Sequence, residues 1–257
     1  MKADLHAHVP QGYANVNKVV DTASSRLSPK GLVVIANFNE LDRYEPLIAA
    51  KGYSRYFTSN GSACYFPEQN LWIIKGAEPM AKLDEGEGEI LGIGIPKGAR
   101  INYQKPIQDT IKEIKDLGGK IIIVHPGLPV GSTAPYFLKH PEQLENAIGI
   151  EAYNQEGQLF RANATTRQIL KKLAPAIQKY HLGLTAGSDA HYPFELGLTY
   201  SKWDVFLPFD EDSDRFIQNL EVIIRNSPRI HAGGKIAGPA GSGMHIAKML
   251  WHKVRQN

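Results

Sequence analysis

The sequence predicts a single α/β domain built on a mostly parallel β-sheet. Short β-rich runs alternate with longer helix-like stretches, 42% of the 257 residues are hydrophobic, and this length suits one large domain. Regular alternation of this kind forms either an open doubly wound sheet or a closed barrel. Both place functional groups at the carboxyl ends of their strands. A barrel made of strands alone fits the pattern less well.

Each element is predicted from its local pattern. Apolar runs between turn residues predict strands at 3–8, 31–36, 71–76, 89–95, 120–125, 148–153 and 182–188. Apolar residues at helical spacing predict helices at 18–25, 41–50, 106–117, 140–146 and 165–180. The segment 51–70, rich in Tyr, Phe, Ser and Asn, follows no regular period, and we expect it to cross the barrel mouth.

The C-terminal part is predicted to form a helical extension. A helix is expected at 214–226 with Ser213 as a candidate N-cap, followed by a Gly/Pro/Ser-rich stretch and an amphipathic segment at 244–257. The glycine-rich stretch lacks the Gly-Lys-Ser/Thr ending of a phosphate-binding loop. We therefore expect a barrel over residues 1–200 and an extension over 201–257 that packs on it, although packing on a second subunit stays open.

Composition limits the class of protein. The single cysteine, Cys64, rules out an internal disulfide framework and a thiolate zinc cluster, so any metal must be held by histidines and carboxylates. A net charge of +3 is far from that of a dedicated nucleic-acid binder. No apolar stretch has the length of a signal peptide or a membrane span. We expect a cytoplasmic protein that does not enter a membrane.

The first candidate ligands lie in the N-terminal strand. His6 and His8 are two residues apart, so both imidazoles point to the same face of a strand, near its carboxyl end. This spacing suits a metal site. Two surface histidines in a fraying strand would give the same pattern, so the rest of the chain must decide between the two interpretations.

Other strand ends carry residues of the same kinds. His125 follows the apolar run KIIIV, Asp189 and His191 follow a strand that ends in small residues, and Glu78 follows the run WIIKG. Each residue alone is more often a hydrogen-bonded core histidine or a solvated charge. Because a barrel brings its strand ends into one pocket, their joint occurrence predicts a metal site in which Glu78 bridges two cations.

The order of these motifs resembles the polymerase and histidinol phosphatase (PHP) superfamily over most of residues 1–200. The motifs that carry the resemblance are DLHAH, GAE, HPG, IEAYN and GSDAH. The resemblance implies a distorted seven-stranded (β/α) barrel, similar to a TIM barrel. It also implies two or three Zn, Mn or Fe ions and hydrolysis of a phosphoester by metal-bound hydroxide.

The resemblance also implies a ligand set. His6, His8, Glu78 and Asp189 match the ligands of the first metal, Glu78 and His125 match those of the second, and Glu89 stands where many members have a further histidine. Two departures concern the third metal, since Phe38-Asn39-Glu40 replaces the usual Thr-Asp-His and no acidic turn follows the first motif. We therefore favour two ions, with Glu40 as a candidate ligand.

Two residues are candidates for direct roles in catalysis. Without a third ion, His191 could orient phosphate or protonate a leaving alkoxide, which is within reach of imidazole at neutral pH. Arg161 follows the IEAYN motif, and its guanidinium fork would match phosphate oxygens. An arginine on a solvated helix start is the alternative.

We expect a phosphatase that acts on a nucleotide or another small phosphorylated metabolite, because the chain shows no additions that grip DNA. A phosphodiesterase or nuclease is the nearest alternative. A catalytically inactive regulatory metal-binding domain is another, and amide or ester hydrolysis ranks last because no lysine takes the place of Glu78. The metal and the oligomeric state stay open.

Overall fold

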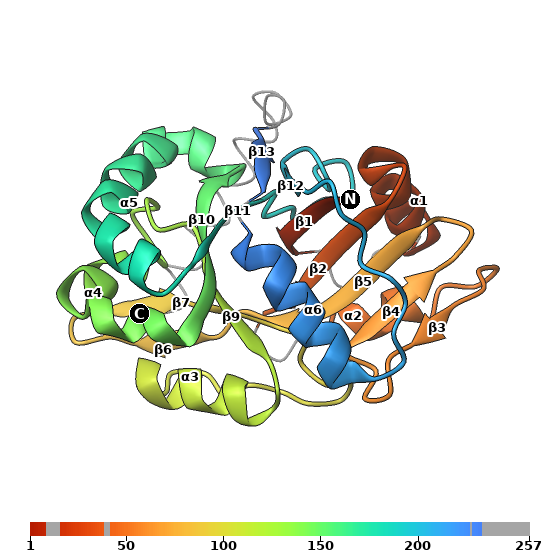
Figure 1. Ribbon diagram of the computed structural model, residues 1–257, viewed down its shortest axis with the longest axis horizontal. Helices are drawn as coiled ribbons and strands as arrows, with labels where there is room; N and C mark the ends of the chain where they lie inside the picture. The colour runs from red at the N-terminus through yellow and green to blue at the C-terminus, as the bar shows by residue number, and fades with distance from the viewer. Residues whose placement is uncertain (9–15, 39–41, 227, 233–257) are drawn as a thin grey trace.

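The computed structural model describes residues 1–8, 16–38, 42–226 and 228–232 (Figure 1). The wall of its barrel-like sheet corresponds to the predicted strands, with shifted ends. These strands are β1 (Lys2–Ala7), β2 (Gly31–Asn37), β5 (Leu71–Ala77), β8 (Leu91–Ile93), β9 (Lys120–Ile123), β10 (Ala147–Asn154) and β11 (Gly183–Gly187). Their order in the sheet is β11-β10-β9-β8-β5-β2-β1.

The first and last strands of this order meet just beyond β11. The amide of Asp189 donates to the carbonyl of His6 at 2.7 Å, and the amide of His8 donates to the carbonyl of Ala190 at 2.7 Å. Ala7 and Ala190 form a parallel bridge at the same place. The sheet is therefore nearly closed, which confirms the α/β class and the TIM-like barrel.

One strand of the wall runs against the others. β8 is antiparallel to both β5 and β9. The predicted strand 89–95 is divided, because Glu89 ends the short strand β7 (Glu87–Glu89), which pairs with β6 (Met80–Lys82) outside the main sheet. As a result, Glu89 precedes β8 and lies at the same barrel end as the carboxyl ends of the parallel strands.

The helices cover the outside of the barrel in two groups. α1 (Val16–Leu27) and α2 (Tyr44–Ile48) lie on the right of Figure 1, whereas α3 (Ile107–Asp116), α4 (Ala134–Lys139) and α5 (Ala162–Lys179) lie on the left. Each group buries apolar side chains against the outward-facing residues of the sheet. The predicted helix 140–146 is the 3-10 helix η1 (Pro141–Asn146). The helix before it, α4, was not predicted.

The prediction that residues 51–70 cross the barrel mouth is wrong. This segment forms β3 (Tyr56–Phe57) and β4 (Ala63–Phe66), an antiparallel pair. β4 pairs with residues 71–74, the first half of β5, so it lies away from the carboxyl ends of the strands. Ser59, Asn60 and Ser62 lie in the turn between β3 and β4, and Asn70 lies in the turn between β4 and β5. The strands between these turns are too short to show a clear period.

A sixth helix closes the other end of the barrel. α6 (Ser213–Arg225) begins after Asp212, whose side chain accepts a hydrogen bond from the amide of Arg215 at 3.0 Å, so Asp212 and not Ser213 is the N-cap. The buried face of α6 belongs to the apolar cluster inside the barrel, with Phe216, Ile217, Leu220 and Ile224. Figure 1 shows α6 lying across the strands.

Two short strands extend the sheet beyond β1. β12 (Tyr200–Lys202) pairs with β1, and β13 (Arg229–His231) pairs with β12, both antiparallel. β12 therefore spans position 200, where the sequence analysis expects the barrel to end. The predicted amphipathic segment 244–257 lies outside the described residues.

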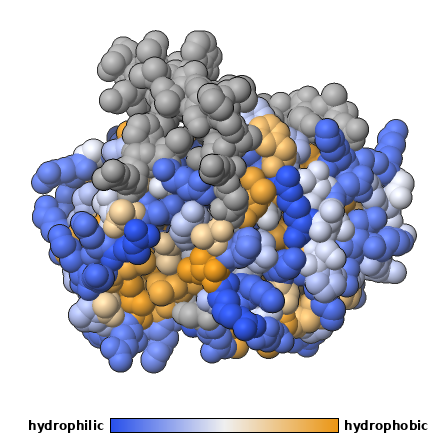
Figure 2. Space-filling model, turned by 90° about the horizontal axis from the view of Figure 1, so that it is seen from above, coloured by the Kyte–Doolittle hydropathy of each residue, from blue (hydrophilic) through white to orange (hydrophobic). Residues whose placement is uncertain are grey.

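The described surface is mixed in character. The face drawn in Figure 2 is mostly hydrophilic, with hydrophobic residues gathered toward its lower left, as is common in folded proteins. Among the described residues, none of the helices combines the length and the apolar character needed to cross a membrane.

Candidate metal centre

His6, in β1, and His8, just after it, point into the barrel at an irregularity in the strand. The pairing of β1 with β2 shifts register between Asp4 and Ala7, which re-aims the side chains that follow. His6 Nε2 and His8 Nε2 lie 3.1 Å apart. His8 Nδ1 is 3.0 Å from the carbonyl of Ala36, and His6 Nδ1 is 3.3 Å from Glu151 Oε1. Nδ1–H groups that donate to these acceptors leave both Nε2 lone pairs for a cation.

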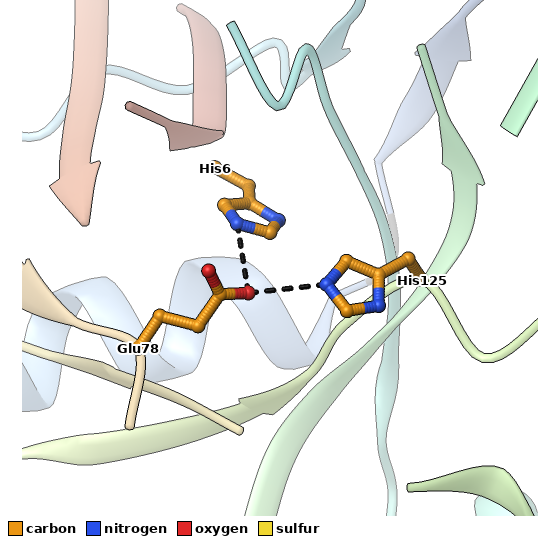
Figure 3. A group of neighbouring side chains, drawn as sticks. All are labelled: His6, Glu78 and His125. Carbon is orange, nitrogen blue, oxygen red and sulfur yellow. Dashed lines mark hydrogen bonds and ion pairs between the residues drawn. The ribbon is translucent and has the colours of Figure 1, made fainter. Parts of the chain in front are cut away.

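Glu78 stands between three imidazoles. It follows β5, and its Oε1 lies 3.1 Å from His6 Nε2 and 3.1 Å from His125 Nε2 (Figure 3). Its other oxygen lies 2.8 Å from His8 Nε2. Ligands of a tetrahedral zinc ion, at about 2.0–2.2 Å from the metal, are separated by roughly 3.3 Å. The spacing of these donor atoms therefore fits a shared cation, and Glu78 offers one oxygen to each side.

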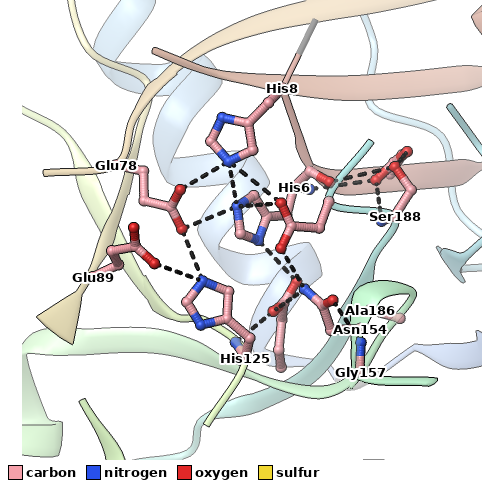
Figure 4. Close-up of polar contacts among 12 residues, drawn as sticks. His6, His8, Glu78, Glu89, His125, Asn154, Gly157, Ala186 and Ser188 are labelled. Carbon is pink, nitrogen blue, oxygen red and sulfur yellow. Dashed lines mark hydrogen bonds and ion pairs between the residues drawn. The ribbon is translucent and has the colours of Figure 1, made fainter. Parts of the chain in front are cut away.

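His125 and Glu89 form the side of the cluster nearest β9. His125 Nε2 lies 3.4 Å from Glu89 Oε2 (Figure 4). Glu89 reaches this position because β8 runs antiparallel, so the residue before β8 meets the residue after β9. Gly131 leaves room for it, since a Cβ atom there would lie 2.3 Å from Glu89 Oε2.

Asp189 and His191 complete the cluster at the closure of the barrel. Asp189 has a left-handed backbone with φ of 53°, and its Oδ1 lies 3.5 Å from His8 Nε2 and 3.8 Å from His6 Nε2. The His191 ring stacks on His8 with centroids 4.9 Å apart. His191 Nδ1 lies 2.8 Å from the carbonyl of Asp189 and 3.2 Å from Glu156 Oε1.

The buried imidazoles and carboxylates of the cluster shift one another's pKa values. Burial disfavours the charged forms of His6 and His125. Nearby carboxylates, Glu78 above all, outweigh burial, so the pKa of His6 lies well above its usual value and that of His125 rises to about 9. Burial, followed by the charge of Glu78, raises the pKa of Glu89 to about 8. Protons are thus held where a cation would relieve the repulsion between carboxylates.

His8 differs from its neighbours. Its burial outweighs the charge of Glu78 and lowers its pKa to about 4. The imidazole is therefore neutral at pH 7, which is the form that binds metal.

Within the part of the chain that the structure describes, three groups of side chains have donor atoms close enough to share an ion. They are His6 with Glu78 and His125, His6 with His8 and Asp189, and Glu156 with Asp189 and His191. The first two groups share His6, and Glu78 belongs to the first of them. The donor set of imidazole and carboxylate fits a divalent ion such as Zn or Mn.

The structure brings most of the predicted site residues together. His6, His8, Glu78, Glu89, His125, Asp189 and His191 all lie in this cluster. Glu40 lies outside the described residues. The backbone of Arg161 ends the 3-10 helix η2 (Glu156–Arg161), and its side chain also lies outside what the structure describes.

Several residues at the site were not among the predicted ligands. Glu151 contacts His6 through Oε1, and its Oε2 accepts from the amide of His125 at 2.6 Å and from Asn154 Nδ2 at 3.1 Å. Glu151 and Asn154 belong to the IEAYN motif, which contributes to the resemblance, but neither residue was predicted to have a role at the site. No local sequence pattern indicated that Glu156 would lie at the site, because its position depends on the turn that follows β10.

Asp4 joins the first and last motifs behind the cluster. Its carboxylate accepts from the amide of Ser188 at 2.8 Å, the hydroxyl of Ser188 at 2.5 Å and the amide of Gly197 at 2.9 Å. These bonds tie β1 to the loop that carries Asp189. Gly187 permits the close approach, since a Cβ atom there would lie 2.5 Å from the Cβ atom of His6.

Comparison with known proteins gives similarity at the level of the fold. No protein-family model matches the chain, and no curated protein matches its sequence. Three of the similar solved structures carry descriptions of hydrolases. An amidohydrolase from Chromobacterium violaceum, solved with bound sulfate and no metal, has a TM-score of 0.54 and 15% identity, over 85% of this chain and 96% of its own.

The second of these is the lesion-specific endonuclease EndoQ from Pyrococcus furiosus, with a TM-score of 0.52 and 14% identity. The match covers 89% of this chain and 56% of the endonuclease. A candidate metal-dependent phosphoesterase from Bifidobacterium adolescentis also has a TM-score of 0.52 and 14% identity, over 88% of this chain and 96% of its own. At these identities the similarity shows a shared fold.

Proposed function

We propose that the chain is a metal-dependent phosphoesterase of the PHP superfamily that hydrolyses a small phosphomonoester. The observation that carries the proposal is the position of Glu78, whose two oxygens face three histidines at 2.8–3.1 Å. The descriptions of two similar structures as a phosphoesterase and an endonuclease support phosphoester chemistry. Divalent ions held here would supply the Lewis acidity that makes water a nucleophile at neutral pH and neutralises charge on phosphate.

The residues of the chain prepare the site for this chemistry. Glu151 and the carbonyl of Ala36 orient the rings of His6 and His8. Burial excludes water from the donor atoms of His6 and Glu78, which strengthens each charge interaction there. His191 is only partly buried, so its imidazole is accessible to exchange a proton with a leaving group.

The amide hydrolase alternative receives less support from the site. Such an enzyme would be expected to use a modified lysine as the bridging group in place of Glu78. Lys75 is buried, and its Nζ donates to the carbonyls of Pro96 at 3.0 Å and Ala99 at 2.9 Å. Lys75 is therefore engaged outside the cluster.

The proposal is tested by elemental analysis of the purified protein and by hydrolysis of a chromogenic phosphomonoester and a chromogenic phosphodiester, with added Mn or Zn. We expect about two ions per chain and faster hydrolysis of the monoester, as in two-metal sites. The variants His6→Ala and Asp189→Ala should lose metal, and their rates should fall by roughly a hundredfold or more. His140→Ala is the control, because His140 pairs with Asp84 at the surface.

Each other result selects an alternative. Faster hydrolysis of the diester would indicate a phosphodiesterase or nuclease, and bound metal without turnover of either ester would indicate a regulatory metal-binding domain. The double variant His6→Ala, Asp189→Ala is measured as well. If it contains no metal and keeps full activity, the protein is not a metalloenzyme.

A further inference from the structure

Arg43 is held next to the candidate metal site by Asn37, the last residue of β2. The amide of Arg43 donates to Asn37 Oδ1 at 2.9 Å, and the amide of Glu78 donates to the carbonyl of Asn37 at 2.8 Å. Asp42 stabilises the turn, since its Oδ1 accepts from the amides of Tyr44 and Glu45 at 3.0 Å each. The backbone at Arg43 is thus fixed relative to the bridging carboxylate.

The guanidinium of Arg43 has no hydrogen-bond or ion-pair partner among the residues that the structure describes. Its side chain is partly buried, and Nε is buried without a partner. Burial lowers the pKa of Arg43, while the charges of Glu78, Tyr103 and Asp189 oppose this effect. Asn37, which holds the Arg43 amide, pairs in register with Ala77, the residue before Glu78, so Arg43 lies at the end of the barrel that carries the cluster carboxylates.

An unpaired buried N–H group is costly, and a buried cation is more costly still. In many proteins such a group is satisfied by a ligand. Guanidinium N–H groups form a planar fork that matches two oxygens of a phosphate. Cations held by Glu78 and Asp189 would attract the same anion, so the positive charges would act on it together.

We propose that Arg43 binds the phosphate of the substrate and favours dianionic phosphomonoesters over monoanionic phosphodiesters. This inference rests on the proposed phosphoesterase function and adds a residue that neither the predicted ligand set nor the predicted catalytic residues contain. A fixed positive charge attracts a dianion more strongly than a monoanion, and the difference is large where water is excluded. Arg43 is thus a determinant of the substrate class.

The test uses the full-length, metal-loaded protein and its variants Arg43→Gln and Arg43→Lys. The control is Arg215→Gln, an exposed arginine on α6 at the opposite end of the barrel, whose partner is Asp210. Binding of inorganic phosphate is measured by titration calorimetry, and metal content is measured on the same samples. Hydrolysis of p-nitrophenyl phosphate and bis(p-nitrophenyl) phosphate gives the ratio of kcat/KM for monoester over diester.

We expect Arg43→Gln to weaken phosphate binding by about tenfold or more, because one or two hydrogen bonds to a charged group are lost. The monoester-to-diester ratio should fall by a similar factor, while metal content stays at the wild-type value. Arg43→Lys should show an intermediate loss, since it keeps the charge without the fork. Arg215→Gln should match the wild type in all measurements.

Wild-type phosphate affinity in Arg43→Gln would overturn the proposal, and so would a loss of metal in that variant, which would make Arg43 part of the metal centre itself. If Arg43→Gln does not fold, phosphate affinity and metal content are measured on Arg43→Lys instead. Wild-type phosphate affinity or a loss of metal in Arg43→Lys would then overturn the proposal. If the wild type hydrolyses neither ester, the proposed function fails. The comparison of phosphate affinities then still decides whether Arg43 binds the anion.

Discussion

Glu151 shows how one residue can hold two others in place. One carboxylate oxygen lies beside His6 Nδ1, and the other accepts from the backbone amide of His125. Asn154 donates both to Glu151 at 3.1 Å and to Asp189 Oδ2 at 3.3 Å. Glu151 and Asn154 therefore connect His6 and His125 with Asp189, behind the donor atoms that would face a cation.

We predict that Glu151→Gln lowers the affinity for Zn or Mn by about 10–100-fold, as is usual when a residue that orients a ligand is lost. The amide N–H of glutamine would donate to His6 Nδ1 and so favour the tautomer with its proton on Nε2, which removes the lone pair that faces the site. Competition with a chelating dye measures the affinity, and circular dichroism checks the fold.

The control is Glu142→Gln, because Glu142 is an exposed residue of η1 whose side chain is 59% accessible. It should bind metal as the wild type does. Equal metal affinities for Glu151→Gln and the wild type would show that Glu151 has no part in orienting His6.

At the scale of elements, the bulges and α6 divide the barrel into a polar end and an apolar end. The pairing of β1 with β2 shifts register between Asp4 and Ala7, and that of β10 with β11 shifts between Glu151 and Tyr153, so these two irregularities occur where strands deliver residues to the candidate metal site. Toward the other end, α6 fills the interior with apolar side chains that pack on residues such as Trp72. The polar cluster at one end of the barrel therefore lies above an apolar core that α6 covers at the other end.

We predict that Phe216→Ala lowers the free energy of unfolding by about 3–5 kcal/mol, as expected for a large side chain removed from a core. Phe216 is fully buried, with its ring centroid 4.4 Å from that of Trp72. Val222 on the same helix is 59% exposed, so Val222→Ala should change stability by less than about 0.5 kcal/mol. Denaturant titration measures both; similar losses in the two variants would mean that α6 does not close the barrel.

At the scale of the whole molecule, the proposed metal site would couple metal binding to the stability of the fold. The buried side chains of Glu78, Glu151 and Asp189 surround His6, whose carbonyl accepts from the amide of Asp189 where the barrel closes. A cation bound there would neutralise them and would bind only the folded state, so it would add stability by mass action.

We predict that removal of metal with a chelator lowers Tm and that added Zn or Mn restores it. At a metal concentration about a hundred times Kd, the loss corresponds to about 2.7 kcal/mol. The double variant His6→Ala, Asp189→Ala serves as the control and should not respond to the chelator. A wild-type Tm that is indifferent to metal would contradict the coupling.

Much of this architecture could be predicted from the sequence, because the strands and the residues that end them are local features. His6, His8, Glu78, His125 and Asp189 each follow or end an apolar run that identifies the strand end. The features that were missed depend on contacts between distant residues. The reversed direction of β8 and the pairing of β4 with β5 are set by partners in space, as is the contact of Glu156 with His191.

The closure of the barrel also sets an order of events during synthesis. His6 and Asp189 belong to adjoining backbones in the finished protein, yet they are 183 positions apart in the chain. A ribosome adds about 5–20 residues per second, so His6 and His8 emerge on the order of ten seconds or more before Asp189 exists. The nascent chain can offer a passing ion only part of the donor set during that interval. For the proposed metal site, we therefore expect high-affinity loading only once the polypeptide is complete.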